Sequence, residues 1–169
     1  MVIFVSADWV AERIDSPDLL LLNPRRPMKY LQGHLKYAVN LPLFRAFDAQ
    51  GTLLAPETLA SWIGAAGLGD QRTPVLYDSP EGQNGAMLAW ILEYLGRTDV
   101  HLLNVFFERW AAEQREVFYK PVQAAATTFT PRVNAQIRVT LDDLRAGPPV
   151  KLIDFRSQEE YSGARDLDG

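Results

Sequence analysis

The chain has 169 residues and a mass of 19.0 kDa, enough for one complete domain and some additional chain. Its composition, 47% hydrophobic and 22% charged, is that of a globular protein, and a net charge of −4 offers no broad basic field to a nucleic-acid backbone. The absence of cysteine excludes disulfides, thiolate metal sites and a thiol nucleophile within these residues.

The first half of the chain alternates helical and extended patterns. After Ser6, a residue suited to cap a helix, apolar residues at helical spacing predict a helix over 7–14. The run LLLLN at 19–23 predicts a strand buried on both faces, as in parallel sheets, and YAVNLP at 37–42 predicts a second short strand. PETLASWIGAAG at 56–67 predicts an amphipathic helix that begins at a proline and ends at a glycine.

The alternation continues through the middle of the chain. TPVLY at 73–77 predicts a third strand, GAMLAWILEYLG at 85–96 a helix, DVHLLN at 99–104 a fourth strand and FERWAAEQ at 107–114 a short helix. This order of elements indicates an α/β fold in which helices cover both faces of a parallel sheet.

The last third of the chain contains a linker and an internal repeat. Residues 115–138 carry Pro, Thr and Ala without a clear period, which is typical of a linker. The opening pattern then returns over 139–163: a capped short helix, an apolar strand (VKLID, 150–154), a polar residue, an arginine two places on and a tyrosine five places later. The corresponding residues are Asn23, Arg25 and Tyr30 in the first copy, and Asp154, Arg156 and Tyr161 in the second. We interpret the chain as one domain over 1–114, a linker over 115–138 and the truncated start of a second domain over 139–169.

Five segments, in order, resemble the two-domain rhodanese family of thiosulfate and 3-mercaptopyruvate sulfurtransferases. They are VSADWVAERI, LLLLNPRRPMKYLQGHL, YAVNLP, VLYDSPEGQNGAMLAWILEYLG and VHLLNVFFERW. The resemblance implies a rhodanese-like fold with a catalytic cysteine in the second domain, whereas the first domain commonly has Asp at the equivalent position. Asp78 stands at that position, so the chain alone is expected to be inactive and the cysteine is expected beyond Gly169.

The activity that this resemblance implies is transfer of sulfane sulfur from thiosulfate or 3-mercaptopyruvate to a thiophilic acceptor, without a cofactor. The expected partners are a small anionic sulfur donor and a second polypeptide that carries the rest of the second domain. The alternative is a cysteine-free rhodanese-like module with a binding or regulatory role; the start of a second copy favours the enzyme. The first residues do not read as a signal peptide and no run approaches the ~20 apolar residues of a membrane span, so a cytoplasmic protein without membrane partners is expected.

Five residues are candidates for a substrate pocket or an interdomain surface. Arg25 and Arg26 could bind an anionic substrate, pair with the other domain or simply be exposed. The resemblance implies that Phe107 is an aromatic wall of the pocket, and it makes Asp154 and Arg156 the second-copy counterparts of Asn23 and Arg25.

Several positions depart from the family pattern. Asn23 replaces an Asp, GHLKYA at 33–38 replaces Gly-His-Ile-Pro-Gly-Ala, and Met87 replaces an Arg in the helix. Val105 and Phe106 replace two glycines, so a turn that needs positive φ would be strained and the loop reshaped. In the second copy, Glu160 stands where thiosulfate-using members can carry a basic residue, which argues against thiosulfate as the preferred donor.

Other polar residues have competing interpretations. His34 could be a general base, but a structural hydrogen bond is favoured, and Ser79 lacks the turn and partners of a catalytic triad. Asp78 and Glu81 could bind a metal, yet two carboxylates without a third ligand favour solvated loop residues.

Three further residues are assigned structural positions. Trp62 and Trp90 fall at helical spacing among apolar residues and are predicted to lie in the core. His101 is predicted to be structural or exposed.

Overall fold

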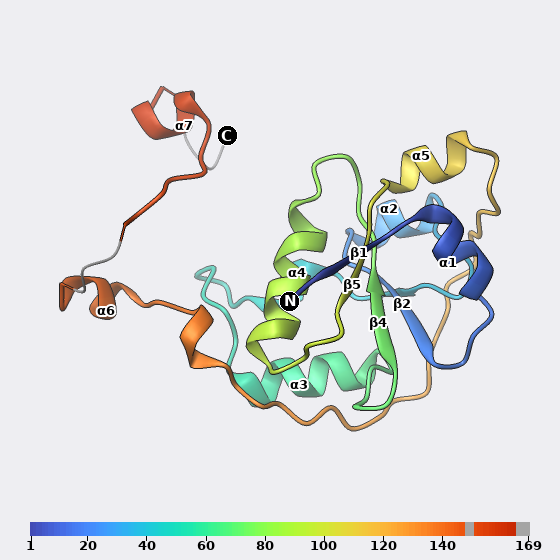
Figure 1. The fold of residues 1–169 in the computed structure, drawn as a ribbon, viewed down its shortest axis with the longest axis horizontal. Helices are drawn as coiled ribbons and strands as arrows, with labels where there is room; N and C mark the ends of the chain where they lie inside the picture. Colours follow the sequence, from blue (N-terminus) through green and yellow to red (C-terminus); the bar gives the residue numbers. More distant parts are fainter. Residues whose placement is uncertain (148–150, 165–169) are drawn as a thin grey trace. The chain divides into compact units, whose positions relative to one another are not determined.

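The computed structural model describes residues 1–147 and 151–164, and the chain forms two compact units, Met1–Arg138 and Val139–Gly169. The first unit is built on a parallel sheet of five strands in the order β1-β5-β4-β2-β3 (Figure 1). The strands are β1 (Ile3–Val5), β2 (Leu19–Asn23), β3 (Val39–Asn40), β4 (Thr73–Leu76) and β5 (His101–Leu103). The helices of this unit are α1 (Ala7–Arg13), α2 (Pro27–Leu31), α3 (Pro56–Ala65), α4 (Gln83–Tyr94) and α5 (Phe107–Ala112), with 3-10 turns at η1 (Leu43–Ala46) and η2 (Ala135–Ile137).

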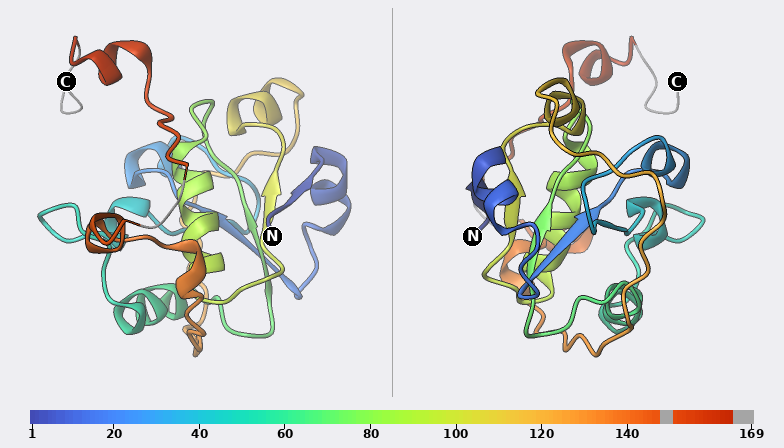
Figure 2. Two further views of the ribbon diagram at one scale, coloured as in Figure 1. Left: turned by 60° about the vertical axis from the view of Figure 1, so that its left-hand side comes forward. Right: turned by 90° about the vertical axis from the view of Figure 1, so that its right-hand side faces the viewer.

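Helices cover both faces of the sheet, as the alternation of elements predicts. Successive strand residues point to opposite faces, so Leu20 and Leu22 pack with α3 and α4, whereas Leu21 packs with α1 and α5. Figure 2 shows α3 and α4 on one side of the strands and α1 on the other. β2 is covered on both of its faces, which explains why its sequence, LLLLN, is an unbroken apolar run rather than an alternating one.

Local sequence signals place several element ends where they were predicted. Ser6 caps α1, because its hydroxyl accepts the backbone N–H of Trp9 at 3.1 Å. Gly96 follows α4 with φ +95, a conformation that favours glycine at a helix end.

Two short elements and the exposure of two tryptophans differ from the sequence-based expectation. The sequence pattern did not predict β1, which pairs with β5 at the edge of the sheet, or α2, which has five residues. It predicted Trp62 and Trp90 to be buried in the core. Trp62 and Trp90 are only partly buried against the core, whereas Trp110 is almost completely buried. Helical spacing identifies the inward face of a helix, but side chains at the margin of that face stay half exposed.

Residues 115–138, which we call the strap, are hydrogen-bonded to the first unit. Phe118 and His34 exchange two backbone hydrogen bonds of 2.8 and 2.9 Å, and Arg132 donates its N–H to the carbonyl of Leu95 at 2.8 Å. Phe129 is buried in the main core. Figures 1 and 2 show the segment, coloured gold to orange, passing around the sheet and below α3. The segment assigned as a linker thus forms part of the surface of the first unit.

The second unit is described over 139–147 and 151–164. It contains two capped helices, α6 (Leu141–Arg145) and α7 (Gln158–Ser162), each begun by a capping box. The predicted strand at 150–154 is not formed over 151–154, and Val150 lies outside the described residues. Leu152 and Ile153 are 72% and 68% exposed. Among the described residues of this unit no strand is present to pair with them, and a lone strand is unstable in water.

Candidate active-site loop

The carboxyl ends of parallel strands meet at one edge of the sheet, and three predicted site residues gather there. Arg25 follows β2, Asp78 follows β4 and Phe107 begins α5 after β5. The N–H of Phe107 donates to the backbone carbonyl of Asp78 at 2.9 Å, and the guanidinium carbon of Arg25 lies 4.2 Å from the centre of the Phe107 ring. The structure therefore joins Arg25, Asp78 and Phe107 in one cluster, which we call the strand-end site.

The carboxylate of Asp78 lies at the N-terminal end of α4 and accepts hydrogen bonds there. One carboxylate oxygen accepts the N–H of Ser79 at 2.8 Å, with the Asn84 amide at 3.4 Å, and the other accepts the N–H of Gly85 at 2.8 Å. The side chain is 5% exposed. Backbone N–H groups and the helix dipole make such a position attractive to an anion, and here the chain supplies that anion itself.

Gly85 allows this close approach of loop and helix. A Cβ on Gly85 would lie 3.2 Å from the Cβ of Asp78 and 3.4 Å from a methyl of Leu102. A side chain at this position would require Asp78 or Leu102 to shift by a few tenths of an ångström, so glycine favours the hydrogen bond between Asp78 and the helix end.

Arg25 is a buried charge, and within the described residues Glu108 lies at ion-pair distance from it. Arg25 is 3% exposed, its guanidinium donates to the carbonyl of Gly33 at 2.6 Å, and its Nε donates to the side-chain oxygen of Asn23 at 3.3 Å. The carboxylate of Glu108 lies 3.9 Å from the guanidinium and is half exposed. Because Asn23 is neutral, Glu108 supplies the negative charge that balances Arg25.

The hydroxyl of Tyr77 ties the strand ends together beneath this cluster. It accepts hydrogen bonds from the Asn23 amide at 2.8 Å and from the N–H of Leu35 at 3.1 Å. Burial raises the pKa of Tyr77 far above its usual range, and its hydrogen bonds and Arg25 offset this only in part. The tyrosine is therefore a neutral structural group.

Arg26 lies outside the strand-end site. Its side chain is exposed and sits over the ring of Phe44, with the guanidinium carbon 5.9 Å from the ring centre. The adjacent arginines thus have different positions, Arg25 below the loop and Arg26 on the surface.

In the second unit, Asp154 and Arg156 repeat the local geometry of Asn23 and Arg25. The Asp154 carboxylate accepts the backbone N–H of Arg156 at 2.9 Å and its Nε at 3.0 Å, just as the Asn23 oxygen accepts both groups of Arg25. Hydrogen bonds from the side chain and backbone of Arg156 hold the pKa of Asp154 below its ordinary value. The two segments therefore share the same local backbone and side-chain hydrogen bonds.

The loop at Val105 and Phe106 avoids the positive φ that would strain these residues. Phe106 has φ −78 and extends into the start of α5, and neither residue has positive φ. Among described non-glycine residues, the positive φ values are those of Tyr37 (60°) and Gln114 (56°). Tyr37 stands where the GHLKYA segment departs from a family glycine, so the strain falls there.

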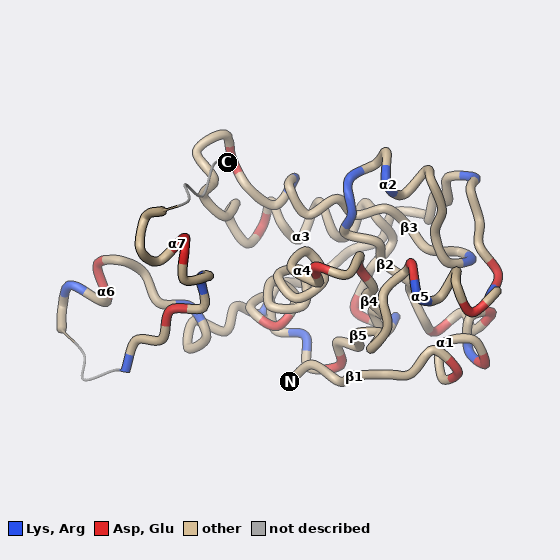
Figure 3. The backbone as a smooth tube through the Cα atoms, turned by 90° about the horizontal axis from the view of Figure 1, so that it is seen from above, with Lys and Arg blue, Asp and Glu red and all other residues tan. Residues whose placement is uncertain are grey.

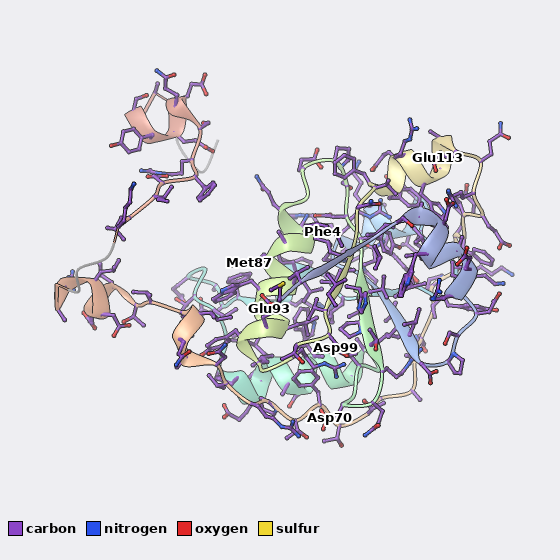
Figure 4. All side chains as sticks on the ribbon, viewed as in Figure 1. Phe4, Asp70, Met87, Glu93, Asp99 and Glu113 are labelled. Carbon is purple, nitrogen blue, oxygen red and sulfur yellow. The ribbon has the colours of Figure 1, made fainter. Side chains whose placement is uncertain are left out.

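Met87 is partly buried against the main core on α4, as Figure 4 shows together with the surrounding side chains. It brings no charge to the helix that follows the Asp78 loop. The cationic group that the resemblance implied at this position is therefore replaced by an apolar contact.

His34 has a structural position. It is fully buried, its Nδ1–H donates to the carbonyl of Tyr30 at 3.2 Å, and its ring stacks on Tyr30 at 4.0 Å between centres. Burial lowers its pKa, and the hydrogen bond to the backbone of Tyr30 opposes this in part. A neutral imidazole sealed from solvent suits a structural role rather than proton exchange with a substrate.

The second histidine also has a structural position. His101 is half buried in β5, where its ring stacks on Trp9 at 5.2 Å between centres.

Among the described residues, the buried Lys, Arg, Asp and Glu side chains are those of Arg25 and Asp78, both in the strand-end site. Figure 3 shows Lys and Arg interspersed with Asp and Glu along the first unit. Figure 4 shows Asp70 and Asp99 at the end of the sheet away from Glu113 and α5. These two aspartates line a cleft together with Arg97. In that cleft Arg97 is already bound to Asp99 and to two backbone carbonyls. Within residues 1–147 and 151–164, no group of three or more His, Cys, Asp or Glu is placed to hold a metal, and no helix has the length and apolar character to cross a membrane.

Sequence reasoning missed two residues of the strand-end site, Gly85 and Glu108. Glycine in the first turn of a helix that follows a strand was the available signal for Gly85. Nothing in the local pattern pairs Glu108 with an arginine that is so distant in the sequence.

Comparison with known proteins identifies relatives of this chain. A family model described as "Rhodanese-like domain" matches residues 6–113. The thiosulfate sulfurtransferase of Corynebacterium glutamicum is 28% identical over 174 residues, covering 94% of this chain and 56% of that protein. A putative thiosulfate sulfurtransferase of Synechococcus elongatus is 31% identical over 144 residues, covering 82% of this chain and 45% of that protein.

Solved structures share the fold. The crystal structure of SseA from Escherichia coli, described as a 3-mercaptopyruvate sulfotransferase, superimposes with a TM-score of 0.78 at 24% identity, over 86% of this chain and 61% of that one. The 3-mercaptopyruvate sulfurtransferase of Leishmania major gives 0.75 at 20% identity, over 95% of this chain and 48% of that one. The chain spans about half the length of the curated relatives that it matches.

Proposed function

The chain belongs to the rhodanese-like domain family, and from this premise we propose that it forms the non-catalytic part of a tandem-domain sulfurtransferase. The parent enzyme would move sulfane sulfur from thiosulfate or 3-mercaptopyruvate to a thiophilic acceptor. The relatives are named as thiosulfate or 3-mercaptopyruvate sulfurtransferases, and these names supply the reaction class of the proposal.

The observation that carries the proposal is the state of the Asp78 loop. Sulfur transfer needs a thiolate that becomes a persulfide, held by backbone N–H groups at a helix N-terminus. Here the N–H groups of Ser79 and Gly85 are bonded to a carboxylate, which cannot carry a sulfane sulfur. The loop keeps the architecture of a nucleophile loop without the chemistry.

The cysteine would then come from outside these residues. None of the 169 residues is cysteine, and the relatives extend well beyond the matched region. We place the nucleophile in the part of the second domain that follows Gly169, on a polypeptide that completes this domain.

The competing function is a cysteine-free binding or regulatory module. The second unit favours the enzyme hypothesis, because Asp154 and Arg156 reproduce the hydrogen bonds that Asn23 and Arg25 make in the first unit. A second copy that retains this arrangement is expected of a tandem enzyme rather than of a lone module.

Two measurements test the proposal. The pure 169-residue chain, supplied with thiosulfate and cyanide or with 3-mercaptopyruvate and a thiol, is expected to form no product above background. Native and denaturing mass analysis of the chain taken from its own cells is expected to show a cysteine-bearing partner. Steady turnover by the chain alone, or a native mass of 19.0 kDa with no partner, would contradict it.

Asp78→Cys provides a further prediction about the loop. The variant is expected to remain below about one-hundredth of the turnover of a cysteine-bearing relative, because Met87 supplies no cation beside the new thiol. Asp78→Ser is the matched control without a thiol. Persulfide on the Asp78→Cys variant with sustained turnover, measured by mass spectrometry and thiocyanate release, would show that the loop needs only the thiol.

A further inference from the structure

A cleft of about 390 Å³ lies at the open edge of the sheet in the first unit. One wall is the edge strand β3 and its continuation, residues 39–42. A second wall is the C-terminal part of α3 with Trp62, and the third is the strap at 122–124. None of these residues belongs to the strand-end site.

The walls of this cleft are fixed by contacts of their own. The N–H of Val122 donates to the Tyr30 hydroxyl at 2.8 Å. Ala124 packs so closely on the turn after α3 that a Cβ added to Gly67 would overlap its methyl group. The cleft is therefore formed before any ligand arrives, as small-molecule sites usually are.

Its lining combines apolar surface with unused hydrogen-bonding groups. Most lining side chains are apolar: Val39, Leu41, Pro42, Ala65, Val122 and Ala124. Leu41 donates its N–H to the carbonyl of Asn23 in β2 at 2.8 Å. Alternation along a parallel strand therefore turns the N–H and C=O of Asn40 outward, to the edge that no strand of the described residues covers. Within the described part of the chain, the indole N–H of Trp62 makes no hydrogen bond.

Arg45 supplies the charge. It is the charged residue of the lining, it is exposed, and among the described residues no carboxylate lies within ion-pair distance of it. An exposed arginine at the rim of an apolar cleft is suited to a carboxylate.

We propose that this cleft binds an apolar residue that has a free carboxylate and an acylated nitrogen, the chemistry shared by N-acyl amino acids and peptide C-termini. The carboxylate pairs with Arg45, the amide meets the outward backbone groups of Asn40, and the apolar side chain lies against Trp62. This site is independent of sulfur transfer, since it shares no residue with the strand-end site.

The site is tested by titrating the full chain with N-acetyl-L-leucine. Binding is followed by tryptophan fluorescence and by chemical-shift changes in heteronuclear NMR spectra. Saturable binding with a Kd on the order of 1 mM is expected for a ligand of this size. N-acetyl-L-leucinamide, which lacks the negative charge, is expected to bind at least tenfold more weakly. Acetyl-Ala-Ala-Leu distinguishes the two sources: tighter binding identifies a peptide tail, and equal or weaker binding a small acyl amino acid.

Variants connect the binding to the cleft. Arg45→Gln is expected to weaken the binding of N-acetyl-L-leucine at least tenfold, and Arg45→Lys is expected to weaken it less. Trp62→Phe is expected to remove the change in tryptophan fluorescence on binding. Arg13→Gln on α1 is the matched control for loss of an exposed arginine and should leave the Kd unchanged. Absence of saturation below about 20 mM, or equal binding of acid and amide or of wild type and Arg45→Gln, would overturn the proposal.

Discussion

Asp78 shows how one residue can close a site while preserving its framework. Its carboxylate satisfies two backbone N–H groups that a bound anion would otherwise satisfy, and it is buried by the loop that it organises. Asp78 follows the strand predicted at 73–77, because the end of an apolar run can be located without tertiary information. The roles of Gly85 and Glu108 could not be predicted, since they depend on how closely distant segments approach.

A second residue-scale feature is the charge of Arg25, and Asn23→Asp is predicted to stabilise the first unit. An Asp would accept the same hydrogen bonds from Arg25 and add a buried counterion, while the Tyr77 hydroxyl could turn to donate to it. The expected gain in the free energy of unfolding is about 1 kcal/mol, measured by urea denaturation.

A double-mutant cycle checks the physical reason for this gain. Glu108→Gln should cost less in the Asn23→Asp background than in the wild type, because Arg25 then has a nearer partner. Equal costs in the two backgrounds would show that Glu108 is not the counterion.

His34 makes stability depend on pH in a defined window. Burial lowers its pKa in the folded chain below the ordinary value of 6.5, so the unfolded chain binds the proton first as pH falls. The free energy of unfolding is thus expected to be full above about pH 6.5 and to decline below it, by at most about 1.4 kcal/mol per pH unit, until the folded pKa is reached.

Urea denaturation from about pH 7.5 to about pH 5.0, a range that spans the ordinary histidine pKa, measures this slope. His34→Gln is expected to flatten it, and His101→Gln, which keeps the buried imidazole, is the control. Parallel pH profiles for wild type and His34→Gln would contradict the assignment. Asp70 does not interfere, because hydrogen bonds from Thr130 hold its pKa below the ordinary range of a carboxyl group.

At the scale of elements, predictability follows the strength of the local pattern. Strand 19–23 and the cap at Ser6 were predicted because four consecutive leucines and a capping hydroxyl are local signals. β1 and α2 were missed because three and five residues carry too little periodicity. The strap has no period either, and its placement depends on glycines far away in the sequence.

Gly64→Ala tests how closely the strap packs against α3. Alanine within a helix normally stabilises by about 1 kcal/mol relative to glycine. At Gly64 its Cβ would lie 2.5 Å from the backbone carbonyl of Thr127, so we expect a loss of about 1–3 kcal/mol instead. Urea denaturation, with limited proteolysis of 115–138, measures the effect.

Ser61→Ala on the exposed side of α3 is the control for that variant. It should leave the stability within about 0.5 kcal/mol of the wild type and the strap resistant to protease. If Gly64→Ala raised the free energy of unfolding, the strap would not be seated as closely as described.

At the scale of the whole molecule, the two units contribute unequally to stability. A chain ending at residue 138 is expected to unfold at the same urea concentration as the full chain, because the described apolar residues of the second unit are largely exposed. A chain ending at residue 114 loses the strap, uncovers Gly64 and Gly67 and removes Phe129 from the core, so it should be less stable by several kcal/mol. Equal midpoints for both truncations would contradict this division.

The contacts along the strap also restrict insertions and deletions within it. Surface connections ordinarily accept inserted or deleted residues. Between Ala124 and Arg132, however, the backbone meets Gly67, Gly64 and Gly96 in turn, each at a distance that leaves no room for a Cβ. One additional residue would displace every later contact from its glycine. Gaps among natural variants should therefore fall outside 124–132, and this irregular stretch should keep its length as strictly as a strand does.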